Sequence, residues 1–94
     1  MQVVKLNNRH NAFKRHGFTA GLRFDKGWDR DAKVVERYLE SVYNTSAYIR
    51  PGMWGNKPVN WYGQYGHKTK GQECAPFWIY LRNESDLSAI MLAI

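Results

Sequence analysis

Hydrophobic and polar positions alternate along residues 18–24, and this alternation predicts a strand with one buried face. The apolar positions of the segment are Phe18, Ala20, Leu22 and Phe24. The positions between them are Thr19, Gly21 and Arg23. Successive side chains of a strand point to opposite faces, so we expect the apolar set to face a core and the other set to face outward.

After the turn signal at residues 25–27, the pattern changes from a period of two to that of a helix. Apolar and aromatic side chains recur at helical spacing at Ala32, Val35, Tyr38, Leu39, Val42 and Tyr43. This spacing predicts an amphipathic helix that runs through Asn44. Either Asp29 or Asp31 is suited to cap its start, because acidic side chains also complement the positive end of the helix dipole.

Two further strands are predicted in the second half of the chain, on either side of a basic hairpin loop at residues 66–71. Prolines and glycines make residues 45–58 a loop. One face of the strand that follows is lined by Val59, Trp61 and Tyr65. The strand over residues 75–82 alternates, and one of its faces holds Phe77, Ile79 and Leu81. Its other face holds Trp78, Tyr80 and Arg82.

A closing helix follows, with Asn83 as its cap and Asp86 completing an approximate capping box. Its apolar stripe consists of Leu87, Ile90, Met91 and Ile94. The predicted order is β-α-β-β-α in one α+β domain over residues 1–94. We expect two helices to pack on one face of a small antiparallel sheet, in a ferredoxin-like arrangement.

The N-terminal segment bears on how this sheet is completed, since a full ferredoxin-like order adds a strand after the last helix. Residues Val3–Leu6 could form that edge strand, the sheet could stay incomplete, or a partner could supply the strand. Residues 7–16 could form a short helix that ends at Gly17, or a loop.

Composition limits the class of protein. With 94 residues, 44% hydrophobic and 15% aromatic, the chain is expected to fold as a single domain and not to be disordered. Cys74 is the only cysteine, which excludes an intramolecular disulfide. The sequence shows neither a signal-peptide pattern nor an apolar run long enough to cross a membrane, so we expect a cytoplasmic protein that does not insert into membranes.

The net charge of +6 is unevenly distributed along the chain. Residues 1–23 contain five basic side chains and no acidic one, and residues 50–70 contain four basic side chains and no acidic one. We expect these two segments to converge on one face. A basic field of this kind attracts polyanions or acidic protein surfaces, although it is also compatible with ordinary solubilising charge.

Motifs for catalysis or metal binding are not found. His10 and His16 lack the paired cysteines of a zinc finger, and Gly63–Thr69 fails the phosphate-loop pattern because His67 separates glycine from lysine. Most carboxylates lie in or beside the first long helix, where they are expected to form a solvated face with intrahelical pairing. We therefore expect no metal or cofactor, and an enzyme is the less favoured interpretation.

The aromatic residues are the most informative set, because one face of the strand over residues 75–82 is already apolar without them. Exposed aromatic side chains beside basic ones are suited to stacking nucleobases or to anchoring a protein partner. Alternatively, a second layer formed by residues 45–58 or by another subunit covers them. The predicted binding residues are Trp78, Tyr80, Arg82, Lys68, Lys70 and Arg23.

Residues 77–90 resemble the third strand and second helix of the RNA-recognition motif, which combines an aromatic-rich strand, a short turn and an Asp-led helix. The resemblance implies that Trp78 and Tyr80 occupy base-stacking positions. The match departs at Cys74, Ala75 and Pro76, where the family has a basic residue followed by Gly-Phe. It covers about a fifth of the chain.

The same C-terminal segment resembles small proteins of tailed bacteriophages. This likeness implies a phage-encoded accessory factor that acts in the host cytoplasm by binding a host component. The sequence thus predicts a small basic non-enzymatic binding module whose partner is nucleic acid or an acidic host protein. The alternative is a structural or homo-oligomeric protein whose aromatic sheet face is a subunit interface.

Overall fold

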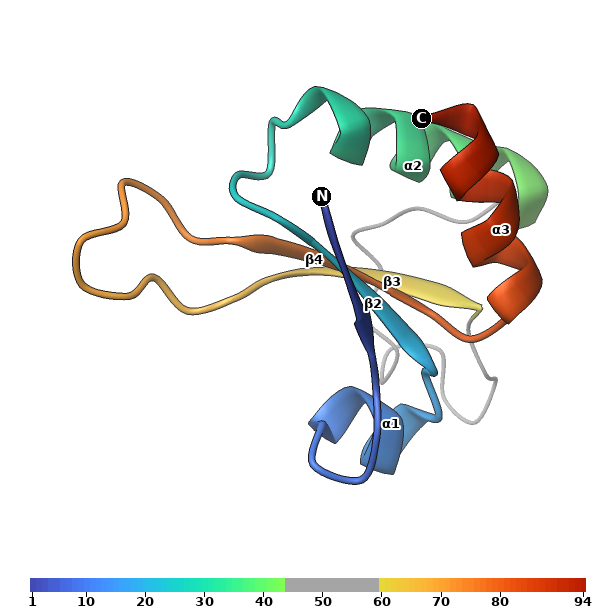
Figure 1. Ribbon diagram of the computed structural model, residues 1–94, viewed down its shortest axis with the longest axis horizontal. Helices are drawn as coiled ribbons and strands as arrows, with labels where there is room; N and C mark the ends of the chain where they lie inside the picture. The colour runs from blue at the N-terminus through green and yellow to red at the C-terminus, as the bar shows by residue number, and fades with distance from the viewer. Residues whose placement is uncertain (44–59) are drawn as a thin grey trace.

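The computed structural model describes residues 1–43 and 60–94, which form an α+β fold (Figure 1). The strands are β1 (Gln2–Lys5), β2 (Ala20–Phe24), β3 (Trp61–Tyr65) and β4 (Phe77–Leu81). They make one antiparallel sheet in the order β1-β2-β4-β3. The helices are α1 (Asn11–His16), α2 (Arg30–Tyr43) and α3 (Glu84–Ala93). Helices α2 and α3 lie over one face of the sheet and α1 lies on the other side (Figure 1).

The edge beside β2 is filled by the N-terminal strand. β1 pairs antiparallel with β2, from Gln2 opposite Arg23 to Lys5 opposite Ala20. Of the three alternatives for this edge, the structure shows pairing by the N-terminal segment, with a strand over Gln2–Lys5 instead of Val3–Leu6. The strictly ferredoxin-like order is wrong, because the fourth strand precedes the β2-α2-β3-β4-α3 unit in sequence instead of following it.

The main core lies between the sheet and the helices α2 and α3. Its buried side chains are Ala20, Leu22, Phe24, Ala32, Val35, Leu39, Trp61, Phe77, Ile79, Leu81 and Ile90. The alternation predicted for β4 is confirmed, since its odd-numbered residues are buried in this core and Trp78 and Tyr80 point to the other face. One face of the sheet thus stabilises the fold, and the other is left to α1.

Phe18 departs from the predicted strand pattern. It is fully buried, but it packs against the ring of Tyr80 and the guanidinium of Arg82, on the face opposite Ala20. The reason is that β2 begins only at Ala20, so Phe18 belongs to the connection that leaves α1. That connection starts at Gly17, whose φ of 73° is a left-handed conformation that glycine adopts without strain and that ends α1.

The helix termini settle two further predictions. The Asp29 carboxylate accepts a hydrogen bond from the Asp31 N–H at 2.8 Å, so Asp29 is the residue that caps α2. Side-chain capping of α3 by Asn83 is wrong. The Asn83 amide instead donates to the Tyr43 hydroxyl at 3.2 Å, and this hydroxyl donates to the buried Asp86 carboxylate. These bonds join the end of α2 to the start of α3.

Several predictions fall outside the described residues. They are the loop over residues 45–58, the helix end at Asn44 and the first strand position at Val59. In the described ranges, no helix combines the length and the apolar character that a membrane span requires.

Candidate aromatic binding face

The sheet face opposite the main core presents two rows of side chains, one beside the other. In the first row, Trp78 of β4 lies between Arg23 of β2 and Gln64 of β3. In the second row, Tyr80 lies between Gly21 and Tyr62. Antiparallel pairing fixes these neighbours, because residues directly opposite each other point to the same face.

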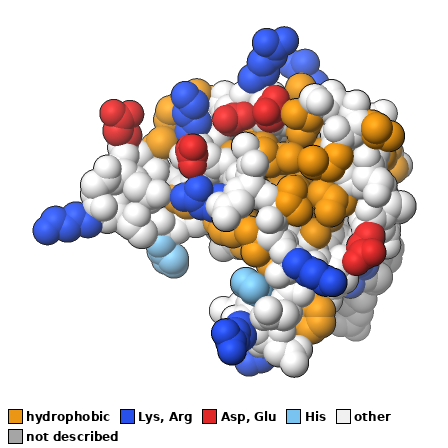
Figure 2. All heavy atoms as spheres, in the orientation of Figure 1, with side chains coloured by type: hydrophobic (Ala, Val, Ile, Leu, Met, Phe, Trp, Pro, Cys, Tyr) orange, Lys and Arg blue, Asp and Glu red, His pale blue; other side chains and the backbone are white. Residues whose placement is uncertain are grey.

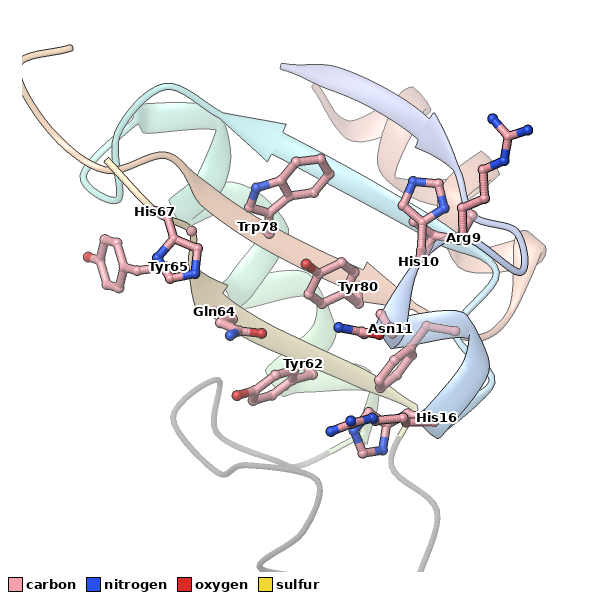
Figure 3. Close-up of a pocket in the computed structure, with 15 residues that line it drawn as sticks. Arg9, His10, Asn11, His16, Tyr62, Gln64, Tyr65, His67, Trp78 and Tyr80 are labelled. Atoms are coloured by element: carbon pink, nitrogen blue, oxygen red, sulfur yellow. The ribbon is translucent and has the colours of Figure 1, made fainter. Parts of the chain in front are cut away.

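Four aromatic rings on this face have similar orientations. The rings of Trp78 and Tyr80 have centroids 5.9 Å apart and planes within 10° of parallel. Tyr62 lies 6.4 Å from Tyr80 at 20°, and Phe18 lies 6.0 Å from Tyr80 at 26°. Tyr80 is therefore the centre of the group (Figure 3). Its burial, with a smaller contribution from Tyr62, raises the pKa of Tyr80, so its phenol stays neutral at physiological pH.

The indole of Trp78 lies across the sheet because two glycines leave room for it. A Cβ atom on Gly21 would lie 3.2 Å from the six-membered ring of the indole. A Cβ atom on Gly66 would lie 3.2 Å from the indole Nε1. Gly21 belongs to β2 and Gly66 follows β3, so the ring spans the width of β4 between them.

These rings border a hollow of about 850 Å³ between the sheet and α1. Its lining residues are Leu6, Arg9, His10, Asn11, Ala12, Arg15, His16, Phe18, Tyr62, Gln64, Tyr65, Gly66, His67, Trp78 and Tyr80. Figure 2 shows the notch between the hairpin and α1, with histidine side chains on both of its sides. No aspartate or glutamate of the described chain lines the hollow, so its charged lining is entirely basic.

Two of the six predicted binding residues line the hollow. Trp78 and Tyr80 are half-buried, and α1 forms a partial second layer beside them. The guanidinium of Arg82 packs on the Phe18 ring, 5.1 Å from its centroid, and lies beside Gly17 at the end of α1.

The other three predicted binding residues lie outside the hollow. Arg23 is in the same sheet row as Trp78, but it forms an ion pair with Asp25 at 2.9 Å. Lys68 and Lys70 are exposed on the loop between β3 and β4, which projects from the body of the protein (Figure 1). These three residues could only contact a ligand that extends beyond the hollow.

Sequence reasoning missed most of the lining of the hollow. Alternation in β3 was sufficient to find Tyr62 and Gln64, because these positions alternate with Trp61, which is in the main core. Tyr65, predicted on the same face as Trp61, is exposed. By contrast, the histidines come from α1 and from the distant hairpin, and only the tertiary fold brings them to one hollow. The predicted convergence of the two basic segments stays a prediction: Arg9 and Arg15 of the first segment line the hollow, Lys68 and Lys70 of the second do not, and Arg50 and Lys57 lie outside the described residues.

The described residues contain no group of three or more histidine, cysteine, aspartate or glutamate side chains that could hold a metal ion. Glu36 differs from the solvated face expected of the first long helix, because it is buried. Asp86 at the start of α3 is also buried. Burial raises the pKa of Glu36, although Lys33 at 3.7 Å partly offsets this effect. Both carboxylates lie away from the hollow lining, so they belong to the packing of the helices.

Comparison with models of protein families, with curated protein sequences and with solved structures gave no match to this chain. The resemblances to the RNA-recognition motif and to tailed-phage proteins therefore stay predictions. What the hollow binds has to be inferred from its shape, its aromatic rings and its charge.

Proposed function

We propose that the protein is a non-enzymatic binding module that binds single-stranded nucleic acid in the hollow between the sheet and α1. The observation that carries this proposal is the combination of near-parallel aromatic rings with a lining in which, among the described residues, every charged side chain is basic. Bases would stack on Trp78, Tyr80 and Tyr62. The backbone phosphates would pass Arg9, which precedes α1, and Arg15 of α1.

Stacking supports this ligand class for a physical reason. Every nucleobase has a π-face, and stacking of one base on an aromatic side chain is worth about 1–3 kcal/mol whatever the sequence. The planes of Tyr62 and Trp78 lie within 20° of the plane of Tyr80, and this shared orientation suits the stacking of successive bases.

The charge around the rings supports a phosphate backbone. Arg9 and Arg15 line the hollow and both are exposed at its rim. Basic side chains that neutralise phosphates release condensed counterions, which makes binding favourable and dependent on salt. The absence of a lining carboxylate among the described residues leaves no repulsive group in this path.

A single strand fits better than a duplex. In a duplex the base faces are stacked on each other, so aromatic rings can reach them only after the bases separate. The hollow is also bounded by α1 on one side and by the β3–β4 hairpin on the other (Figure 3). These walls leave space for a chain of bases and hinder the approach of a rigid duplex.

The rival proposal, a subunit interface on the aromatic face, is less well supported. The most exposed apolar side chain among the described residues is Leu92 of α3, at 90%, and Met91 and Ile94 near it are also exposed. These residues lie on the other side of the sheet from the hollow. If the protein forms homo-oligomers, this helix is the better candidate for contact. If the resemblance to tailed-phage proteins is correct, the protein would be an accessory factor that binds nucleic acid of the host.

The test is fluorescence anisotropy with a labelled single-stranded oligonucleotide of roughly ten nucleotides, its duplex and a base-free polyanion such as polyphosphate. We expect the single strand to bind most tightly. Trp78→Ala should weaken its binding roughly 5- to 150-fold, because one stacking contact is lost.

Trp28→Ala is the matched control for this test. Trp28 is 64% exposed and lies near Lys26, outside the hollow lining. Its loss should leave affinity unchanged. Equal binding of polyphosphate, or equal effects of the two tryptophan substitutions, would contradict the proposal and favour a general polyanion or an acidic protein as the partner.

A further inference from the structure

We infer that His16 and His67 contact the phosphates of the bound strand from opposite walls of the hollow, and that they do so as imidazolium ions. Binding would then take up protons. The inference rests on the proposed function, because it assumes a phosphate backbone in the hollow. It adds two binding residues to that site, and it makes the affinity depend on pH between about 5 and 8, where imidazole gains its proton.

The histidines are gathered at the hollow. All three histidines of the chain line it. His16 is the last residue of α1, and His67 lies in the hairpin loop that follows β3. Both side chains are exposed, and they belong to the two walls that bound the hollow (Figure 3). A strand that lies on the aromatic rings between these walls would bring its backbone within reach of both imidazoles.

The rings of His16 and His67 are free to bind a ligand. Within the described residues, neither ring makes a hydrogen bond or an ion pair. His16 packs beside Phe18, with the ring centroids 6.1 Å apart. His10 is different, because its Nδ1 accepts a hydrogen bond from the Asn7 N–H at 3.1 Å. A proton on that atom would break this bond, so we assign the proton uptake to His16 and His67.

The charges around the two imidazoles favour an anionic ligand. No carboxylate of the described chain lines the hollow, and the neighbours in sequence are basic, with Arg15 before His16 and Lys68 after His67. A bound phosphate would therefore be the first negative charge in the lining, and an opposite charge close by favours the protonated form of an imidazole.

The histidines are also the groups of the lining whose charge changes in this pH range. Arginine keeps its charge and phenols stay neutral between about pH 5 and 8. The other titratable side chains of the lining are Arg9, His10, Arg15, Tyr62, Tyr65 and Tyr80. Since the complex would hold more protons than the free protein, linkage requires that affinity for the strand rises as the pH falls.

The experiment measures the affinity for an oligouridine of roughly ten nucleotides from about pH 8 to about pH 5.5, at constant ionic strength. The strand has no terminal phosphate and its dye does not titrate, so proton uptake comes from the protein. For the wild type we expect affinity to rise roughly 10- to 100-fold as the pH falls, about 3- to 10-fold for each histidine. Combining His16→Gln with His67→Gln should reduce this rise to less than about 2-fold.

Fixing the charge should give the complementary result. Arginine is charged throughout this range, so His67→Arg should bind more tightly than the wild type at about pH 8 and lose the share of the pH dependence that belongs to His67. Calorimetry in two buffers with different ionisation enthalpies counts the protons directly. The wild type should take up protons on binding, and the variant that lacks both His16 and His67 should not.

His10→Asn is the matched control. Asparagine offers an oxygen that can accept the Asn7 N–H in place of the imidazole, and it is favoured at the N-cap position that His10 occupies in α1. This variant should keep the pH dependence of the wild type. Loss of the pH dependence in His10→Asn would overturn the assignment to His16 and His67.

The remaining results separate this inference from the proposed function. A wild-type affinity that does not change with pH, or a pH dependence that survives the loss of both His16 and His67, would overturn the inference and leave the stacking site intact. A failure of the single strand to bind at every pH would overturn the proposed function itself.

Discussion

The indole of Trp78 lies 3.2 Å from the position that a Cβ atom on Gly21 would occupy. Gly21 is in the middle of β2, where glycine weakens a strand because it has no side chain to pack. Here the missing side chain makes room for the ring. The floor of the hollow thus depends on a residue that is neither aromatic nor charged.

Gly21→Val tests this dependence. The branched side chain would displace the indole from its position, so we expect affinity for single-stranded nucleic acid to fall about as far as in Trp78→Ala, roughly 5- to 150-fold. Valine is favoured in strands, which should limit the loss of stability. Anisotropy and thermal unfolding measure the two effects, and full affinity in this variant would show that the indole need not lie flat.

Phe77→Ala and Trp78→Ala should differ in their effects on stability, because adjacent residues of β4 face opposite sides of the sheet. Phe77 is 3% exposed in the main core, so its truncation should cost roughly 3–5 kcal/mol of unfolding free energy. Trp78 is only half-buried, so its truncation should lower the unfolding free energy by less. Urea denaturation of both variants measures this. If Trp78→Ala proves the more destabilising, its face is a second core and not a binding surface.

The two faces of β4 could be predicted from sequence because a strand has a strict period of two. The same rule was wrong for Phe18, since alternation says nothing about where a ladder of hydrogen bonds begins. The edge strand was open to three interpretations because the segment is short. It becomes a strand by pairing with β2, and the sequence does not show which strand a short segment pairs with. Local sequence preference determines where helices and strands form. The order of the strands in the sheet depends on tertiary contacts between strand edges.

The hollow could be predicted only in part, and for a different reason. Trp78 and Tyr80 were found because an aromatic residue on the free face of a strand is visible in the sequence. His16 and His67 were not, because they come from α1 and from the hairpin and line one hollow only once the chain has folded. Net charge likewise indicated a polyanion but not which basic side chains surround the rings.

The salt dependence of binding should separate Arg9 and Arg15, the two arginines that line the hollow, from the lysines of the hairpin. Arg9→Ala with Arg15→Ala should flatten the slope of log affinity against log salt by roughly one unit for each lost phosphate contact, even for a short oligonucleotide. Lys68→Ala with Lys70→Ala should flatten this slope only for an oligonucleotide long enough to extend beyond the hollow. Titrations with oligonucleotides of two lengths measure this, and an unchanged slope for the lysine pair at both lengths would remove the hairpin from the binding site.

Glu36→Gln should make the stability of the protein less dependent on pH. Burial raises the pKa of Glu36, so the folded chain binds a proton there more readily than the unfolded chain does. The wild type therefore gains stability from this group as the pH falls through the raised pKa, a gain that glutamine cannot make. We expect the variant to be at least as stable as the wild type near neutral pH.

This advantage of the glutamine variant should shrink as the pH falls toward about 4, near the ordinary pKa of a glutamate. Melting temperatures across this range measure the difference. Glu73→Gln is the control, since Glu73 is exposed and its loss should change stability little. A difference that grows at low pH would mean that the ion pair with Lys33 outweighs burial.

The pairing of β2 with β4 joins residues 20–24 to residues 77–81, so the centre of the sheet closes across most of the chain. Pairings between segments this distant in sequence slow folding, because the entropy of closing the loop is lost before any contact is gained. Gly21 and Trp78 lie on these two strands, and no shorter segment can build their arrangement.

A ligand that stacks on Trp78 should then bind only the fully folded chain. At about one hundred times its dissociation constant, it would add roughly 2.7 kcal/mol to the free energy of unfolding. Strands and helices on both faces of the sheet would be protected together, and hydrogen exchange would show this as a uniform slowing across residues far from the hollow.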